Sequence, residues 1–151
     1  MKHSTMNHVN HDYTIMFFVM ILSGFLSTMN VWADKLDDVR FSLNDVYMTL
    51  LMSGWMFLFM GLYYKELPIT IIGLCLVVLN IWCIRTQFLI STDQYILGMI
   101  PHHSMAIHMS RKLLEKETIE SKQSKQSRIK EFVKNIIKTQ EDEIQFMKQN
   151  I

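Results

Sequence analysis

Three long apolar runs constrain the fold of this chain more than any other feature of its sequence. They cover residues 13–32, 46–64 and 67–86, and within them only Arg85 carries a charge. An α-helix of about twenty residues rises about 30 Å, which is the thickness of the hydrocarbon core of a bilayer. Because lipid offers no hydrogen-bond partners to the backbone, we expect each run to form a membrane-spanning helix. Only Lys65-Glu66 separates the second run from the third, which predicts a tight helical hairpin.

The flanks of these runs leave two questions open. Val31-Trp32-Ala33 resembles a signal-peptide cleavage site, but the first run is long for a signal core and only Lys2 is basic before it, which favours a retained helix. The positive-inside rule does not decide the orientation, because the flanking basic residues divide two against three between the two sides of a three-span protein. The two are Lys2 and Lys65, and the three are Lys35, Arg40 and Arg85.

Outside the membrane domain of residues 13–87, the chain divides into a short tail and a second domain. Residues 1–12 are a polar tail rich in His and Met. In residues 88–151 apolar residues recur at helical spacing, which predicts two helices, over about 91–117 and 123–149. The expected fold class is therefore all-α.

Two features should shape the first helix of this second domain. Ser91-Thr92-Asp93-Gln94 has the form of a capping box, with Ser91 as the cap and Gln94 bonded back to it. Pro101 removes one backbone hydrogen bond, which predicts a kink or an interruption at that point.

The two helices of this domain should fold back on each other. In an antiparallel arrangement His103 lies level with Gln140, and Met99 lies level with Glu143. A hairpin of this size buries too little apolar surface to be stable alone. We therefore expect a homodimer in which two hairpins complete a four-helix bundle.

A cluster of metal-ligand side chains lies in the segment from Met99 to Met109. It holds three His and three Met in eleven positions. Imidazole and thioether groups suit copper, above all Cu(I), and imidazole also suits zinc. On one helix these side chains can form a mixed nitrogen and sulfur site, for which we expect the ligands Met99, His102, His103 and Met109, with Met105 as a weaker one.

Polar residues of the second helix can support this cluster in two ways. Gln140 or Glu143 can orient a ligating His through its other ring nitrogen. In the alternative interpretation there is no metal, and the paired His with Gln140 and Glu143 lock a helical dimer as a structural or interaction module. His108 points almost opposite to His103 on the helix and is expected to face solvent.

Other function classes find little support. The net charge of +1 gives no reason to expect a nucleic-acid partner. Di-iron oxidases of the bundle type need Glu-x-x-His pairs on two helices, which this chain lacks. No nucleophile-base pairing or cofactor motif is evident, so we do not expect an enzyme.

Two further patterns contain potential copper ligands. In the N-terminal tail a free amine, two amides and His3 can hold Cu(II) in a square plane, and His8 and His11 can add a weak site. A flexible polar tail is the simpler interpretation. In the second apolar run Met residues recur every fourth position, which fits either a Cu(I) track or packing between spans. They are Met48, Met52, Met56 and Met60.

Part of the chain carries the motif of a known family. The stretch DQYILGMIPHHSMAIHMS, followed by IIKTQEDEIQFMK, resembles the bacterial domain of unknown function family 305, whose copper-binding members are called CopM-like. The family pattern falls on Asp93, Tyr95, Met99, Ile100, Pro101, His102, His103, Ala106, Ile107 and Met109, and continues on Ile136, Ile137, Gln140, Glu143, Ile144 and Met147.

The resemblance covers about residues 88–149 and implies a ferritin-like helical bundle associated with copper handling. The three apolar runs are similar to those of a membrane-anchored subset of the family. The resemblance also implies a bacterial cytoplasmic membrane with residues 88–151 on its periplasmic face. This chain has one short copy of the motif, so a complete site is expected to need a second chain.

Overall fold

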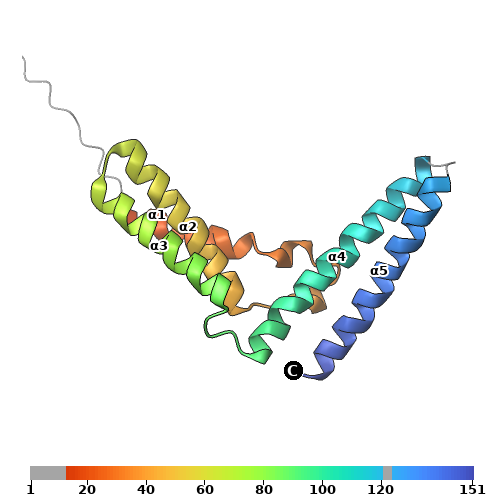
Figure 1. Ribbon diagram of the computed structural model, residues 1–151. Helices are drawn as coiled ribbons and strands as arrows, with labels where there is room; N and C mark the ends of the chain where they lie inside the picture. Colours follow the sequence, from red (N-terminus) through yellow and green to blue (C-terminus); the bar gives the residue numbers. More distant parts are fainter. Residues whose placement is uncertain (1–12, 121–123) are drawn as a thin grey trace, which may run out of the picture.

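The chain folds into two helical arms that meet in a V (Figure 1). The computed structural model describes residues 13–120 and 124–151, and within these residues it contains helices and no strand. One arm holds α1 (Tyr13–Leu26), α2 (Leu43–Tyr64) and α3 (Leu67–Thr86), and the other holds α4 (Thr92–Glu120) and α5 (Ser124–Gln149). Two short 3₁₀ turns, η1 (Met29–Trp32) and η2 (Leu36–Asp38), connect α1 to α2. The predicted all-α class is confirmed.

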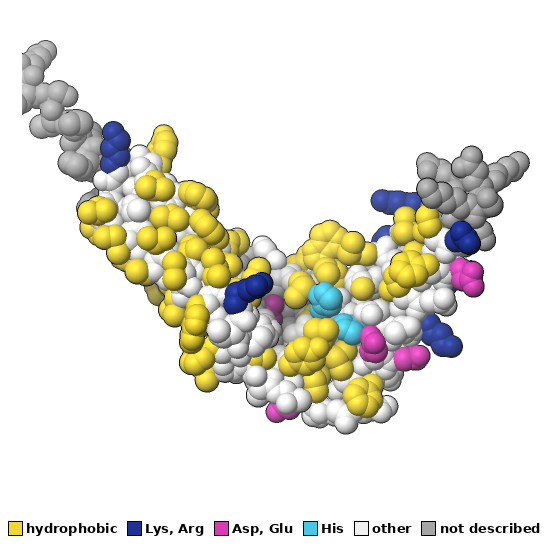
Figure 2. Space-filling view, in the orientation of Figure 1, with side chains coloured by type: hydrophobic (Ala, Val, Ile, Leu, Met, Phe, Trp, Pro, Cys, Tyr) yellow, Lys and Arg dark blue, Asp and Glu magenta, His cyan; other side chains and the backbone are white. Residues whose placement is uncertain are grey.

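Three helical segments are long and apolar enough to cross a membrane. They run from Tyr13 to Trp32, from Leu43 to Tyr64 and from Leu67 to Thr86. In the first segment α1 itself ends at Leu26 and η1 completes the length. Apolar side chains cover the outside of this arm (Figure 2), and Phe18 is 65% exposed. Such a surface is expected of helices that face lipid, since water would penalise it.

The second and third apolar helices form the predicted tight hairpin. Lys65 ends α2 in the left-handed conformation, with φ 58°, and Pro68 stands in the first turn of α3. A Cβ atom added to Gly73 would overlap the backbone of Leu58. The two helices therefore touch backbone to backbone, as small residues allow between apolar helices.

The predicted capping box at Ser91 is only half correct. Ser91 Oγ accepts the backbone N–H of Gln94 at 3.3 Å. The side chain of Gln94, however, does not reach back: its Oε1 accepts the backbone N–H of Leu43 at 2.7 Å. Gln94 thus satisfies a free donor at the first turn of α2. The complete box is at Ser42, whose side chain accepts the backbone N–H of Asp45 and whose own backbone N–H donates to Asp45 Oδ2 at 2.8 Å.

Two details of the second arm differ from the predictions. α4 runs through Pro101, so the interruption that was one of the two predicted effects of this residue is absent. The register of α4 against α5 also differs from the predicted one by about one turn, because His103 meets Glu143 rather than Gln140. α4 extends to Glu120, three residues past the predicted end, and this moves the turn towards the C-terminus. Each residue of α4 consequently faces a later residue of α5.

A buried serine joins the second arm to the connection between α1 and α2. Ser104 of α4 is fully buried, its Oγ accepts the backbone N–H of Asp34 at 2.8 Å, and its hydroxyl donates to Asp38 Oδ2 at 2.6 Å. The side chain of Asp38 is only 5% exposed. A buried carboxylate is costly without partners, so this contact fixes the connection firmly to α4.

Ion pairs surround this serine. Lys148 of α5 contacts Asp37 and lies 2.6 Å from Asp38 Oδ1, and Arg111 lies 2.5 Å from both Asp34 Oδ2 and Glu141 Oε1. We call Asp34, Asp38, Ser104, Arg111 and Lys148 the polar clasp. Burial alone would lower the pKa of Lys148, but the two carboxylates raise it above its ordinary value. The ammonium of Lys148 lowers the pKa of Asp37.

The polar clasp agrees with three membrane crossings. A chain that crosses three times returns the α1–α2 connection and the segment after α3 to the same side. These are the two parts that the clasp joins. The second arm is therefore held by a second attachment in addition to its covalent link to α3.

We predict that Ser104→Ala loosens the second arm. The change removes a hydroxyl from a fully buried position and leaves the Asp34 N–H and one Asp38 oxygen without a partner. A loss of about 1–3 kcal/mol in the free energy of unfolding is expected. Thermal unfolding and hydrogen exchange of residues 33–42 in detergent measure it. Ser110→Ala, on a half-exposed position of the same helix, should change neither, and equal behaviour of the two variants would contradict the role of Ser104.

Candidate functional site

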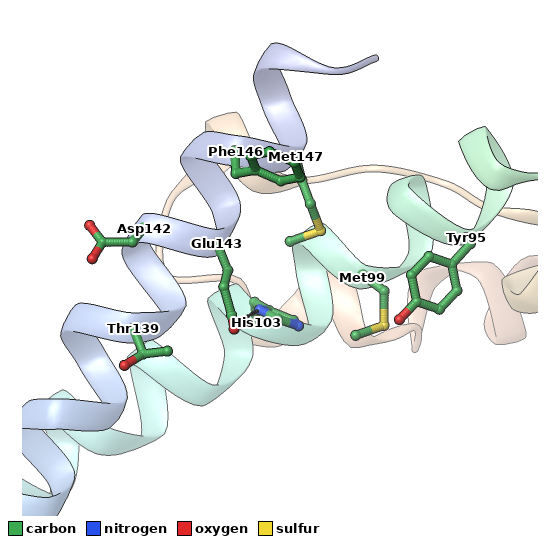
Figure 3. A pocket seen from close by; sticks show the side chains of 8 residues that line it. All are labelled: Tyr95, Met99, His103, Thr139, Asp142, Glu143, Phe146 and Met147. Atoms are coloured by element: carbon green, nitrogen blue, oxygen red, sulfur yellow. Dashed lines mark ion pairs between the residues drawn. The ribbon is translucent and has the colours of Figure 1, made fainter.

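An open cavity of about 390 Å³ lies between α4 and α5 on one side of the second arm (Figure 3). Its walls combine two thioethers, one imidazole, two carboxylates and two aromatic rings, contributed by Tyr95, Met99 and His103 from α4 and by Thr139, Asp142, Glu143, Phe146 and Met147 from α5. The small hydrophobic core of this arm consists of Ile100, Ile107, Ile144 and Met147, and Met147 also lines the cavity.

His103 is the central polar group of this cavity. Its side chain is 13% exposed, and its Nδ1 lies 2.9 Å from Glu143 Oε2. Despite this short distance, the buried Nδ1 has no hydrogen-bond partner, and the contact with Glu143 is an electrostatic one. Gln140 Nε2 donates to the same carboxylate oxygen at 3.2 Å. Glu143 is thereby placed between His103 and Gln140.

The surroundings of His103 favour its neutral form. Burial lowers the pKa of His103 below its ordinary value, the charge of Glu143 opposes this shift, and the neighbouring His102 adds to it. The net pKa is lowered, which favours the uncharged imidazole at neutral pH. A neutral imidazole is the form that binds metals.

Two thioethers flank this imidazole. In Figure 3 the ends of Met99 and Met147 both point towards the ring of His103, whereas Asp142 points away from it. Met99 lies one helical turn before His103 on α4, and Met147 lies one turn after Glu143 on α5. The fold thus places two soft sulfur ligands and one imidazole in a single cavity, and these are ligand types that suit Cu(I).

The other predicted ligands do not join this cavity. His102 is exposed, and its ring centroid is 5.8 Å from that of His103. Met109 lies ten residues after Met99 on an unbroken helix, which is a separation of about 15 Å. Within the described residues no three side chains of His, Cys, Asp or Glu lie close enough together to hold a metal ion. The predicted set of Met99, His102, His103 and Met109 therefore does not converge within one chain.

Two predictions about other histidines have different outcomes. His108 was expected to face solvent, but it is half-buried and its Nδ1 lies 3.9 Å from Asp34 Oδ1, beside the polar clasp. The tail histidines His3, His8 and His11 lie outside the described residues.

Sequence reasoning missed Met147 as a potential ligand and Ser104 as a buried anchor. Met147 falls on the predicted apolar face of the second helix, and the error of one turn in register removed it from the neighbourhood of His103. The only available signal for Ser104 was its place on the helix among apolar residues. Its partners lie 66 and 70 residues away in the chain, so no local pattern identifies them.

Comparison with known proteins places the chain in a family. Residues 91–151 match the family model described as Domain of unknown function (DUF305). An uncharacterized protein of Acanthamoeba polyphaga mimivirus is 40% identical over 146 residues, which cover 91% of this chain and 90% of that protein. No solved structure was found to match. The chain belongs to the DUF305 family, and its similarity to the viral protein extends well beyond the α4–α5 arm.

We predict that Glu143→Gln lowers the pKa of His103 further. The carboxylate of Glu143 stabilises the charged imidazole, so its removal leaves burial and His102 unopposed. Because the pKa is already below its value in the unfolded chain, protonation of His103 destabilises the fold, and this loss begins as the pH falls below about 6.5. NMR titration of the His103 ring in detergent measures the midpoint. Asp142→Asn is the matched control, and an equal shift in both variants would argue against the specific pairing.

Proposed function

We propose that this protein is a membrane-anchored metal-binding protein that holds Cu(I) in the cavity between α4 and α5, in the service of copper sequestration or tolerance. The observation that carries the proposal is the arrangement of Met99, His103 and Met147 around one space. Thioether and imidazole ligands are soft enough to prefer Cu(I) over harder cations, whereas zinc would be held mainly by the imidazole.

The electrostatics of the cavity support this function. A metal competes with protons for an imidazole, and the lowered pKa of His103 reduces that competition at neutral pH. Glu143 lies against Nδ1, which leaves the other ring nitrogen for the metal. The cavity is open to solvent and partly lined by apolar side chains, so an ion can enter without crossing the core.

In this proposal the three apolar helices act as an anchor. The polar clasp holds the metal-binding arm on the side of the membrane to which the α1–α2 connection belongs. The family resemblance implies the periplasmic face of a bacterial cytoplasmic membrane, whereas the 40% identical relative is a viral protein.

A structural or interaction module is the competing proposal. The observation that favours it is the chain of contacts from His103 to Glu143 to Gln140, which joins α4 to α5 without a metal. The arm also has a small core, and Phe132 and Phe146 of α5 are more than 60% exposed. Two hairpins packed through such residues would form the four-helix homodimer expected above.

We predict that Met99→Leu/Met147→Leu weakens Cu(I) binding by about a hundredfold or more, since even changes outside the ligand set cost 10–100-fold in metal affinity. The change conserves volume, so the fold should persist. Titration of the full-length protein in detergent against a Cu(I) chelator measures the affinity. Met105→Leu/Met109→Leu is the control and should bind like the wild type, because both residues lie outside the cavity. Unchanged affinity in the first variant would overturn the copper proposal.

We predict different results from His103→Ala under the two proposals. If His103 is a metal ligand, the variant loses Cu(I) affinity and the copper-dependent increase in melting temperature. If His103 instead locks the bundle, the variant loses dimerisation or thermal stability, and copper changes neither property in the wild type. Size determination by light scattering and thermal unfolding with and without copper separate the two cases. His102→Ala, which changes the exposed neighbour, is the control.

A further inference from the structure

One face of α4 takes no part in the cavity or in the polar clasp. At 100° per residue, six residues of α4 fall within an arc of about 60°. They lie on the side of the helix opposite to His103 and Ile107, which face α5 and the core. We call them the outer stripe: Gln94, Gly98, Met105, Met109, Lys112 and Lys116.

The beginning of the outer stripe touches the end of an apolar helix. Gln94 accepts the backbone N–H of Leu43, the first residue of α2, at 2.7 Å. A Cβ atom added to Gly98 would lie 3.1 Å from Ser42 Oγ. The face of α4 that bears the outer stripe is thus the face turned towards the start of α2. Because α2 crosses the membrane in this interpretation, the same face is turned towards the membrane.

The rest of α4 stays close to the ends of the apolar helices. Arg111 pairs with Asp34, which follows Trp32 at the end of the first apolar segment by two residues. Gln94 and Arg111 are separated by seventeen residues, or about 25 Å of helix. A helix that left the membrane along its normal would carry Arg111 far from Asp34. α4 instead runs beside the level at which the apolar helices end, with α5 on its outer side (Figure 1).

The later part of the outer stripe is exposed and has the chemistry of a membrane surface contact. Met109 is 54% exposed and the adjacent Leu113 is 40% exposed, while Lys112 and Lys116 are exposed beside them. Lys112 also pairs with Glu115 at 2.8 Å. Apolar side chains bordered by lysines are typical of helices that lie in the lipid interface. Hydrophobic side chains gather on the arm at the inside of the V (Figure 2).

The charge of the surrounding segment agrees with an anionic lipid surface. Residues 111–130, on both sides of the turn between α4 and α5, contain seven Lys and Arg against three Glu, a net charge of +4 that comes from residues 121–130, although the whole chain carries only +1. Basic residues near a membrane gain free energy from anionic headgroups. Acidic residues are concentrated elsewhere, in the α1–α2 connection and near the end of α5.

We infer that the outer stripe of α4 rests on the headgroup region of the membrane that α1, α2 and α3 cross, with Met109 and Leu113 at the level of the upper acyl chains and Lys112 and Lys116 on anionic lipid phosphates. The cavity on the opposite side of α4 then faces away from the lipid. This inference rests on the membrane crossings and is independent of copper binding.

Spin labels on opposite sides of the arm test this contact. Met109→Cys and Asn135→Cys are each labelled with a nitroxide in a full-length chain in which Cys75 and Cys83 are replaced by Ala. At 100° per residue Asn135 lies opposite Val133 and Ile144, which face the core of the arm. The protein is placed in vesicles of equal parts phosphatidylcholine and phosphatidylglycerol. We expect the label at 109 to be more accessible to oxygen and the label at 135 to be more accessible to a water-soluble nickel chelate.

A pair of matched charge reversals tests the role of the lysines. Lys112→Glu/Lys116→Glu should weaken the contact of the outer stripe with the lipid surface by about fivefold for each lysine. This is measured as a loss of the preferential oxygen access to the label at 109. Lys134→Glu/Lys138→Glu has the same charge and spacing on α5 and should preserve that preference. A label at Lys116 repeats the measurement without altering Met109.

Two results would overturn the inference. Equal access of the nickel chelate to positions 109 and 135 would show that water covers both faces. Spin-spin broadening at 109 that disappears on dilution with unlabelled protein, without an oxygen preference, would show that a second copy of the chain covers the outer stripe.

Discussion

The contact on which the architecture depends is the hydrogen bond between Ser104 and the nearly buried carboxylate of Asp38. A carboxylate that loses its water needs compensating donors, and Ser104 and Lys148 supply them from α4 and α5. The α1–α2 connection, α4 and α5 are therefore held together at one point. This contact also fixes α4 beside the ends of the apolar helices.

The sequence predicted those parts of the fold that depend on local composition. The apolar runs predicted both ends of α3 and the end of α2, whose start lies three residues earlier than predicted, and helical periodicity predicted α4 and α5. Errors arose where a side chain has more than one possible hydrogen-bond partner. Gln94 was expected to cap its own helix, but the free backbone donor at Leu43 offered it a better-placed partner in another element. Such competition cannot be decided from the residues around Gln94 alone.

The candidate site shows the same division. Met99, His103 and Glu143 were predicted because their types and spacing carry chemistry, and the structure brings them into one cavity. Met109 and His102 were predicted with them because a segment of sequence does not distinguish the two sides of a helix until its neighbours are known. Met147 joined the cavity through a register that depends on the length of α4, which the polar segment after it does not specify.

The polar clasp also has a consequence for biosynthesis. Asp38 leaves the ribosome 110 residues before Lys148 (148 minus 38), and Ser104 is made between them. At ordinary rates of translation the carboxylate waits on the order of ten seconds for its last partner. During that time the connection between the first two apolar helices lacks the contacts with α4 and α5 that hold it in the folded chain. The two arms can lock together only after the third apolar helix has been synthesised, so closure of the clasp follows the synthesis of all three apolar helices.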